Sequence, residues 1–140
     1  MADSTIRAAL PDDFEGVAGV LEQPSEETRA TAIRWIGSGG TLVAVRRGSI
    51  VGFSVTTPTF FGNDFIEMLQ VRKDARRRGV ASMLLDAASA QRCTEKMFTS
   101  TNLSNSPMQA LLGHLRWESV GIVYGLDDAD PELFYKASTR

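Results

Sequence analysis

The sequence predicts a single α/β (α+β) domain with a mixed, mostly antiparallel central sheet and helices on both faces. Three observations support this fold class. The chain has 140 residues, 43% hydrophobic and 23% charged, which is typical of one compact domain. Its strand and helix patterns follow the order βααβββαβαββ. The sequence shows no internal repeat, low-complexity tract or interdomain linker, so residues 1–140 are expected to form one functional domain.

The first forty residues predict one strand and two helices. The apolar run Ile6 to Leu10 precedes Pro11-Asp12-Asp13, which indicates a strand and then a helix with an aspartate N-cap. A second helix is expected after Ser25, because acidic residues fill the turn that follows this favoured cap. The glycine-rich run from Gly37 to Gly40 should end that helix.

Three strands are expected next. Thr41 to Arg46 and Ile50 to Thr57 are rich in Val, Ile, Phe and Thr. They flank Arg47-Gly48-Ser49, where the glycine can adopt a positive φ, so the two runs predict a hairpin. Phe65 to Val71 is apolar almost throughout, which favours a central strand covered on both faces.

The second half predicts two helices and three strands. Apolar residues recur at helical spacing from Val80, so a helix should run to about Arg92. Lys96 to Thr101 is expected to be a strand, and Ser106-Pro107 to start another helix. The end of the chain reads as a hairpin with strands Ser119 to Leu126 and Glu132 to Ala137.

Overall charge and composition exclude several function classes. The formal charge of -2 disfavours nucleic acid or an anionic membrane as a partner. The first ten residues lack an apolar signal core, and no apolar run approaches the ~20 residues that span a bilayer. The single Cys93 cannot form an internal disulfide, so a cytoplasmic location is expected. Metal-ligating residues do not occur at useful spacing, so we expect no metal.

One segment stands out by its local charge. Five of the fifteen basic residues fall within seven positions: Arg72, Lys73, Arg76, Arg77 and Arg78. The segment lies between a predicted strand and the start of a helix, where unpaired backbone N–H groups and the helix dipole favour an anion such as a pyrophosphate. Gly79 would allow close backbone approach, and Ala81 is small for the same reason. The alternative is a solvated basic loop with an ordinary turn glycine.

The residues Arg76, Gly79 and Ala81 match the pyrophosphate turn of the GNAT acyltransferases, Gln/Arg-x-x-Gly-x-Gly/Ala, and the sequence resembles this family. The preceding strand, Ile66 to Val71, is similar to the strand that the family places before the turn. A second match is Asn105, which begins a helix ending at Leu115-Arg116-Trp117. The resemblance implies two splayed parallel strands, Phe65–Val71 and Lys96–Thr101, that hold the pantetheine arm of acetyl-coenzyme A.

The resemblance also implies a reaction and a set of binding residues. It implies an N-acetyltransferase that uses acetyl-coenzyme A (acetyl-CoA) as cosubstrate and acetylates a small-molecule or peptide primary amine by direct attack in a ternary complex. The implied cofactor-binding residues are Leu69, Gln70, Val71, Arg76, Arg77, Arg78, Gly79, Val80, Ala81, Ser82 and Asn105. Asn105 could instead serve only as a helix N-cap. Exposed strands in the C-terminal hairpin would allow a homodimer.

The proton-transfer residues depart from the family pattern. Leu112 stands where many members have a tyrosine that protonates the leaving thiolate. Tyr124, Ser104 or a water are the alternatives for the general acid. Glu67 is the candidate general base, because a carboxylate on a semi-buried strand can have its pKa raised. The alternatives are that Glu67 pairs with a neighbouring Arg or faces solvent, and that a bound water is the base.

The remaining conspicuous residues are assigned mainly to structure. Trp35 and Phe53 are expected in the core, whereas Phe60 and Phe61 could line an acceptor pocket. His114 is expected at the surface. Two alternatives to the enzyme remain: a non-catalytic coenzyme A-binding regulatory module, and acylation of aminoacyl-tRNA, which the acidic net charge disfavours.

Overall fold

The computed structural model describes residues 3–138 and contains a seven-stranded sheet with the strand order β1-β2-β3-β4-β5-β7-β6. The elements are β1 (Ser4–Ala8), η1 (Pro11–Asp13), α1 (Phe14–Val20), α2 (Glu26–Gly37), β2 (Thr41–Arg46), β3 (Ser49–Phe60), β4 (Asn63–Val71), η2 (Lys73–Ala75), α3 (Val80–Ala90), β5 (Met97–Asn102), α4 (Ser106–His114), β6 (Glu118–Val123) and β7 (Glu132–Lys136). The predicted fold class and order of elements are confirmed, and η1 and η2 are additional 3₁₀ turns.

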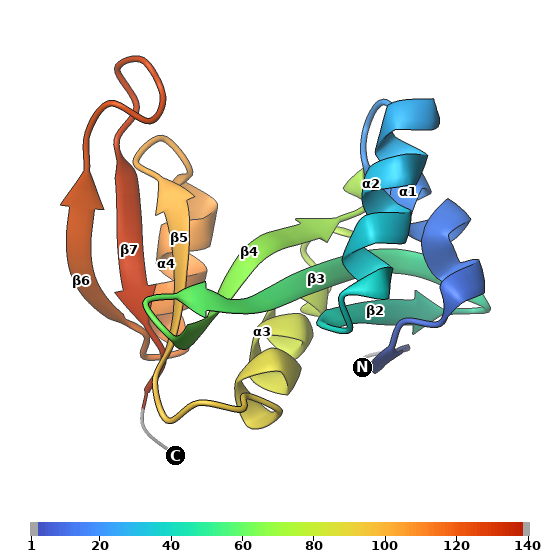
Figure 1. Cartoon of the computed structure of the whole chain (residues 1–140), viewed down its shortest axis with the longest axis horizontal. Coiled ribbons are helices and arrows are strands. Elements are labelled where there is room, and N and C mark those ends of the chain that lie inside the picture. Colours follow the sequence, from blue (N-terminus) through green and yellow to red (C-terminus); the bar gives the residue numbers. More distant parts are fainter. Residues whose placement is uncertain (1–2, 139–140) are drawn as a thin grey trace. The chain divides into compact units, whose positions relative to one another are not determined.

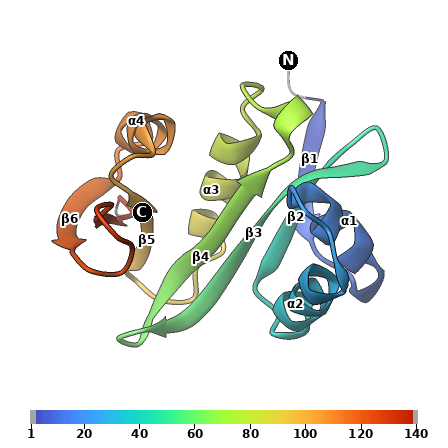
Figure 2. The same ribbon diagram turned by 90° about the horizontal axis from the view of Figure 1, so that it is seen from above.

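The described residues form two compact units. The first comprises the chain up to Thr57 together with Met68–Gln91, and the second comprises Pro58–Glu67 and the chain from Arg92. In the first unit, α1 and α2 lie on one face of the strands and α3 lies on the opposite face (Figures 1 and 2). The core beneath α1 and α2 contains Phe53, which is fully buried with its ring centroid 5.5 Å from that of Trp35. Both aromatic residues therefore serve the core, as predicted.

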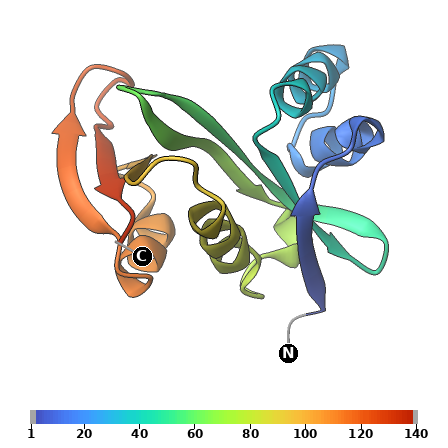
Figure 3. The same cartoon turned by 60° about the horizontal axis from the view of Figure 1, so that its bottom comes forward.

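The second unit contains the parallel strand pair. The start of β4 pairs with β5 from Asp64↔Met97 to Ile66↔Thr99. Strand β7 lies antiparallel between β5 and β6, and α4 covers one face of these strands (Figures 1 and 3). The β4–β5 register ends at Ile66, although β4 continues to Val71 and β5 to Asn102. This short pairing agrees with the expectation of two parallel strands that separate.

Local sequence signals explain most boundaries. The Ser25 hydroxyl accepts a hydrogen bond from the Thr28 amide at 3.2 Å, so the predicted cap of α2 is confirmed. The β2–β3 hairpin is tighter than predicted, because Arg46 pairs with Ser49 and only Arg47 and Gly48 form the turn. Both turn residues have positive φ, at 52° and 78°, as the twist of a two-residue hairpin requires.

Several predicted boundaries are wrong by a few residues. β1 lies two residues earlier than expected, β3 extends to Phe60, and β6 ends at Val123 rather than Leu126. An aspartate, Asp13, occupies the N-cap position of α1 as predicted, but its side chain makes no cap hydrogen bond to this helix. Its carboxylate instead accepts the Leu10 amide at 2.7 Å and binds the guanidinium of Arg7. The charged partner on β1 is visible only in the folded chain.

Candidate functional site

The predicted anion-binding turn lies between the end of β4 and the first residue of α3. The strand end is fixed to its neighbour by a hydrogen bond of 2.7 Å from the Arg72 amide to the Val51 carbonyl. The short turn η2 follows, and its Ala75 is fully buried and anchors the loop. The chain then reaches the exposed residues Arg76 to Gly79 before Val80 begins the helix. The strand–turn–helix context that the sequence predicted is confirmed.

The backbone of this turn contains two residues with positive φ. Arg77 has a φ of 65° and Gly79, the N-cap of α3, has a φ of 80°. Left-handed residues in such a turn allow successive N–H groups to form a concave anion-binding nest. The first hydrogen bond of the helix joins the Met83 amide to the Gly79 carbonyl, and no side chain caps the N-terminus. The amides of Val80, Ala81 and Ser82 therefore have no intrahelical acceptor and can bind an anion.

The basic side chains of the turn fall into two groups. Arg72 pairs with Asp74, with 2.6 Å between Nε and Oδ1, and this hydrogen bond lowers the pKa of Asp74. The Arg76 guanidinium donates to the Val71 carbonyl at 3.1 Å and lies 3.4 Å from a Glu22 oxygen. Arg77 and Arg78 are exposed and form no ion pair within residues 3–138. They are the two arginines of the turn that are free to neutralise a phosphate.

The position of α3 depends on a close approach to the sheet at Gly52. A Cβ added there would lie 3.1 Å from the Gln70 carbonyl oxygen and 3.1 Å from a Val80 methyl group. The hydrogen side chain of Gly52 thus allows the first turn of α3 to pack directly on β3 and β4. Val80, Leu84 and Leu85 are buried at this contact or in the adjoining core. The glycine therefore helps to fix the helix N-terminus that presents the amides.

The remaining predicted cofactor-binding residues lie on two different elements. Leu69, Gln70 and Val71 form the last part of β4 and are half-buried. Asn105 belongs to the second unit, where its Oδ1 accepts the Met108 amide at 3.2 Å and caps α4. Asn105 thus has the structural role that the sequence offered as an alternative. Its exposed side chain leaves a role toward the cofactor as a prediction.

The catalytic candidates are less organised than the turn. Glu67 is exposed on β4, so the solvent-facing alternative holds and the semi-buried environment expected for a base is wrong. Tyr124 lies just beyond β6 rather than within a strand, with 73% of its surface exposed. Leu112 is fully buried within α4, and its carbonyl accepts the Trp117 amide. Ser104 is bound to Asp130 through both its amide and its hydroxyl.

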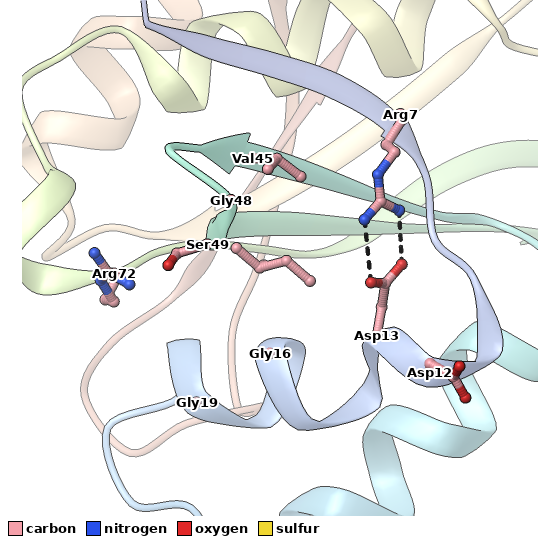
Figure 4. Close-up of a pocket in the computed structure, with 10 residues that line it drawn as sticks. Arg7, Asp12, Asp13, Gly16, Gly19, Val45, Gly48, Ser49 and Arg72 are labelled. Atoms are coloured by element: carbon pink, nitrogen blue, oxygen red, sulfur yellow. Dashed lines mark hydrogen bonds and ion pairs between the residues drawn. The ribbon is translucent and has the colours of Figure 1, made fainter.

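A separate pocket of about 370 Å³ lies in the first unit between α1 and the β2–β3 hairpin (Figure 4). Two of its charged residues are paired with each other, because Arg7 binds both carboxylate oxygens of Asp13, at 2.7 and 3.1 Å. These hydrogen bonds raise the pKa of Arg7 and lower that of Asp13. Arg72 at the far end of the pocket is paired with Asp74. The pocket contains no predicted site residue, and we do not assign the reaction to it.

Sequence reasoning missed an aromatic group in the second unit. The Phe60 ring lies within 6 Å, centroid to centroid, of four other rings, those of Phe61, Phe65, Phe98 and Phe134. Only Phe60 and Phe61 were singled out, because adjacent aromatics are conspicuous in a sequence. The others come from three further strands, and their convergence depends on the strand order. The burial alternation along β5 that places Phe98 is a property of the folded chain, and the sequence of this strand shows no matching alternation of apolar and polar residues.

Other classes of site are not represented among the described residues. Residues 3–138 contain no group of three or more His, Cys, Asp or Glu side chains placed to hold a metal ion. Within the same residues, no helix is long and apolar enough to cross a membrane. His114 and Cys93 are both exposed, which confirms the surface position expected for the histidine.

Comparisons with known proteins agree with this geometry. The model of the acetyltransferase (GNAT) family matches residues 5–115. A GNAT-family acetyltransferase of Bacillus cereus is 29% identical, with a TM-score of 0.90 and 98% of each chain covered. A GNAT-family acetyltransferase of Streptococcus agalactiae is 16% identical, with a TM-score of 0.79 and coverage of 98% of this chain and 96% of that one.

A third structure has a more specific name. The ribosomal-protein-S18-alanine N-acetyltransferase of Escherichia coli is 18% identical, with a TM-score of 0.74 over 96% of this chain and 92% of that chain. At this identity it supports the fold alone. The search of curated proteins gave no match. The family match spans most of the sequence and includes the strand, turn and helix described above, and the chain therefore belongs to the GNAT family of acetyltransferases.

Proposed function

We propose that this protein is an acetyl-CoA-dependent N-acetyltransferase that acetylates a primary amine by direct attack in a ternary complex, with residues 1–140 as its catalytic domain. The observation that supports it most is the turn from Arg76 to Ala81. There, two left-handed residues and an uncapped helix N-terminus leave several amides for a pyrophosphate. No heavy atom lies within 4 Å of where a Cβ of Gly79 would be, apart from its chain neighbours, so the turn has room for a phosphate group.

The binding residues have separate roles in this proposal. The amides of Val80, Ala81 and Ser82 bind the pyrophosphate, and Arg77 and Arg78 add charge-assisted hydrogen bonds. The backbone of Leu69, Gln70 and Val71 on β4 binds the pantetheine arm, and Asn105 adds a side-chain hydrogen bond. Arg76 supports the turn through its bond to the Val71 carbonyl.

The chemistry needs a neutral amine and an activated acetyl group. Acetyl-CoA supplies the acetyl group as a thioester when it is bound. Glu67 removes a proton from the acceptor ammonium, directly or through water, so that the nitrogen lone pair can attack. The amide of Leu69 polarises the thioester carbonyl, and positioning supplies much of the rate. Tyr124 or water returns a proton to the leaving thiolate.

The cofactor part of the proposal is tested by ligand-dependent thermal unfolding. Acetyl-CoA at about 100 times its dissociation constant should stabilise the fold by ~2.7 kcal/mol. Arg78→Glu should weaken this stabilisation, because it places a negative charge beside the phosphates. Lys73→Glu on η2 is the matched control with the same charge change, and it should retain the stabilisation. Absence of any stabilisation at millimolar acetyl-CoA would refute the proposal.

A second candidate function is a non-catalytic coenzyme A-binding module. It is favoured by the burial of Leu112 and by the exposure of Tyr124, which leave no organised general acid. Release of coenzyme A thiol with a panel of amines separates the two functions. Turnover that falls in Glu67→Gln would exclude the module, whereas binding without turnover would support it.

A further inference from the structure

The second unit presents an open aromatic sheet face whose chemistry has not been assigned. Burial alternates strictly along β5, with Met97, Thr99 and Thr101 buried and the residues between them half-buried. In this unit α4 covers one face of the strands (Figure 1), so the alternation assigns the buried residues to the α4 side. Phe98 and Ser100 then point to the opposite face.

Aromatic rings gather on this opposite face. Phe60 stacks on Phe65 and Phe134 at centroid separations of 4.9 and 5.7 Å and lies 5.2 Å from Phe98. These four rings are half-buried rather than buried, so part of each ring surface remains open to a ligand. Packed rings with an accessible side provide a rigid apolar surface on which an aromatic or branched apolar group gains contact area at little entropic cost.

One end of this face is negatively charged. Residues opposite each other in an antiparallel pair share a face, so Phe134 lies beside Ser100 and Glu132 beside Asn102. The Glu132 carboxylate accepts hydrogen bonds from the Ser100 hydroxyl at 2.7 Å and from the Asn102 amide at 3.1 Å. The same amide nitrogen lies 2.9 Å from an oxygen of Asp127. No Lys or Arg in residues 3–138 forms an ion pair with Glu132.

The other end of the face carries an ion pair. Lys136 lies opposite Phe98, and its ammonium is 3.7 Å from a carboxylate oxygen of Glu118. Lys136 follows Glu132 by four positions on β7, which corresponds to roughly 14 Å along the strand. The face therefore runs from a neutralised ion pair, over stacked rings, to a fixed carboxylate without a cationic partner. This charge pattern is complementary to a ligand with an apolar body and a cation at one end.

From this pattern we propose that the acceptor is a diamine with an aromatic or branched apolar spacer, one nitrogen of which stays protonated at Glu132 while the other reacts. The inference rests on the proposed acetyl transfer, because it names the substrate class of that reaction. The Glu132 carboxylate is held in place by two hydrogen-bond donors, so its position suits an ammonium group of the ligand. The spacer lies on Phe60, Phe98 and Phe134. Glu132 is thus a specificity residue.

A matched series of benzylamines tests this inference. The three acceptors carry an aminomethyl, a methyl or a carboxylate group para to the reacting CH₂NH₂, so only the charge at the far end changes. After correction for the two equivalent amines of the diamine, kcat/KM should fall from cation to neutral to anion, with about tenfold between the extremes, as a partly exposed ion pair allows. Equal rates, or a preference for the carboxylate, would overturn the inference.

Variants test whether Glu132 causes the preference for the cationic benzylamine. Glu132→Gln should reduce the cation-to-neutral ratio of kcat/KM to near one, whereas Asp128→Asn, in the loop between β6 and β7, should leave the ratio unchanged. A ratio is independent of the folded fraction, so partial unfolding of Glu132→Gln does not obscure the result. Phe134→Leu should raise KM for all three benzylamines while preserving their order. Retention of the cation preference in Glu132→Gln would contradict the assignment.

Binding measurements test this inference independently of the proposed function. Saturation-transfer NMR of the same three amines ranks their affinity without turnover, and the diamine should bind most tightly. Thermal stabilisation by acetyl-CoA, measured without acceptor, tests the proposed function alone. Stabilisation with no charge preference among the amines overturns only the inference made here. Charge-ranked binding without stabilisation by acetyl-CoA overturns only the acetyl transfer.

Discussion

Replacing Gly79 by alanine should destabilise the protein by strain alone. Gly79 has a φ of 80°, and an added Cβ would meet no heavy atom within 4 Å outside its chain neighbours. The left-handed conformation costs an L-residue about 1–2 kcal/mol. Alanine has less conformational entropy than glycine in the unfolded chain, which stabilises the folded state by about 0.5–1 kcal/mol. The net loss is therefore ~1 kcal/mol, or roughly 3–5 °C in Tm for a chain of this size.

Two further substitutions of glycine separate the strain of the left-handed backbone from the other effects of an added side chain. Gly79→Asn should be less costly than Gly79→Ala, because asparagine tolerates the left-handed region. Gly113→Ala in α4 also adds a methyl group into open space, but at an ordinary helical φ, so it should stabilise by up to ~1 kcal/mol. Thermal and urea unfolding measure all three. The reasoning fails if Gly79→Ala unfolds at the wild-type temperature, or if asparagine is as costly as alanine.

Three other predictions concern the packing and charges around the candidate site. Gly52→Ala should lower the free energy of unfolding by about 1–3 kcal/mol, because the new methyl group meets a backbone oxygen and a Val80 methyl group at 3.1 Å. Urea unfolding measures this, and unchanged stability would show that α3 shifts freely. Asp13→Asn should lower the free energy of unfolding by ~1 kcal/mol at pH 7, because hydrogen bonding to Arg7 lowers the pKa of Asp13. The difference in stability between the two proteins should vanish as the pH falls through that lowered pKa. A difference that does not change with pH would contradict this. Leu112→Tyr should destabilise the fully buried position without raising kcat, and a gain in kcat would show that a tyrosine there reaches the reaction.

The sequence predicted those parts of the fold that depend on local rules. Ser25 caps α2, the run from Thr41 to Arg46 is a strand with the expected bounds, and the helix after Gly79 begins at Val80. Each of these features depends on residues within a few positions of one another. The partner of the Asp13 side chain was not predicted, because Arg7 lies on the preceding strand, outside the local pattern that indicates a helix start.

The candidate site also has a part that depends on local sequence and a part that depends on the fold. The turn from Arg76 to Ala81 was predictable because strand, glycine and helix are consecutive, and the groups that we propose to bind an anion there are backbone amides. The arginines were not distinguishable in the sequence. Only the fold shows that Arg76 is bound to Val71 and Glu22, whereas Arg77 and Arg78 remain exposed. Among the four arginines of this segment, the proposed phosphate contacts are thus narrowed to Arg77 and Arg78.

The aromatic face that we propose for the acceptor depends on side chains brought together by strand order. Phe60, Phe65, Phe98 and Phe134 are spread over more than seventy residues of sequence and meet because β3, β4, β5 and β7 are consecutive in the sheet. Backbone amides bind a pyrophosphate whatever side chains surround them, but the aromatic face is set by the particular residues of this chain. Substitutions on that face should therefore change which amine is acetylated while leaving the affinity for acetyl-CoA intact.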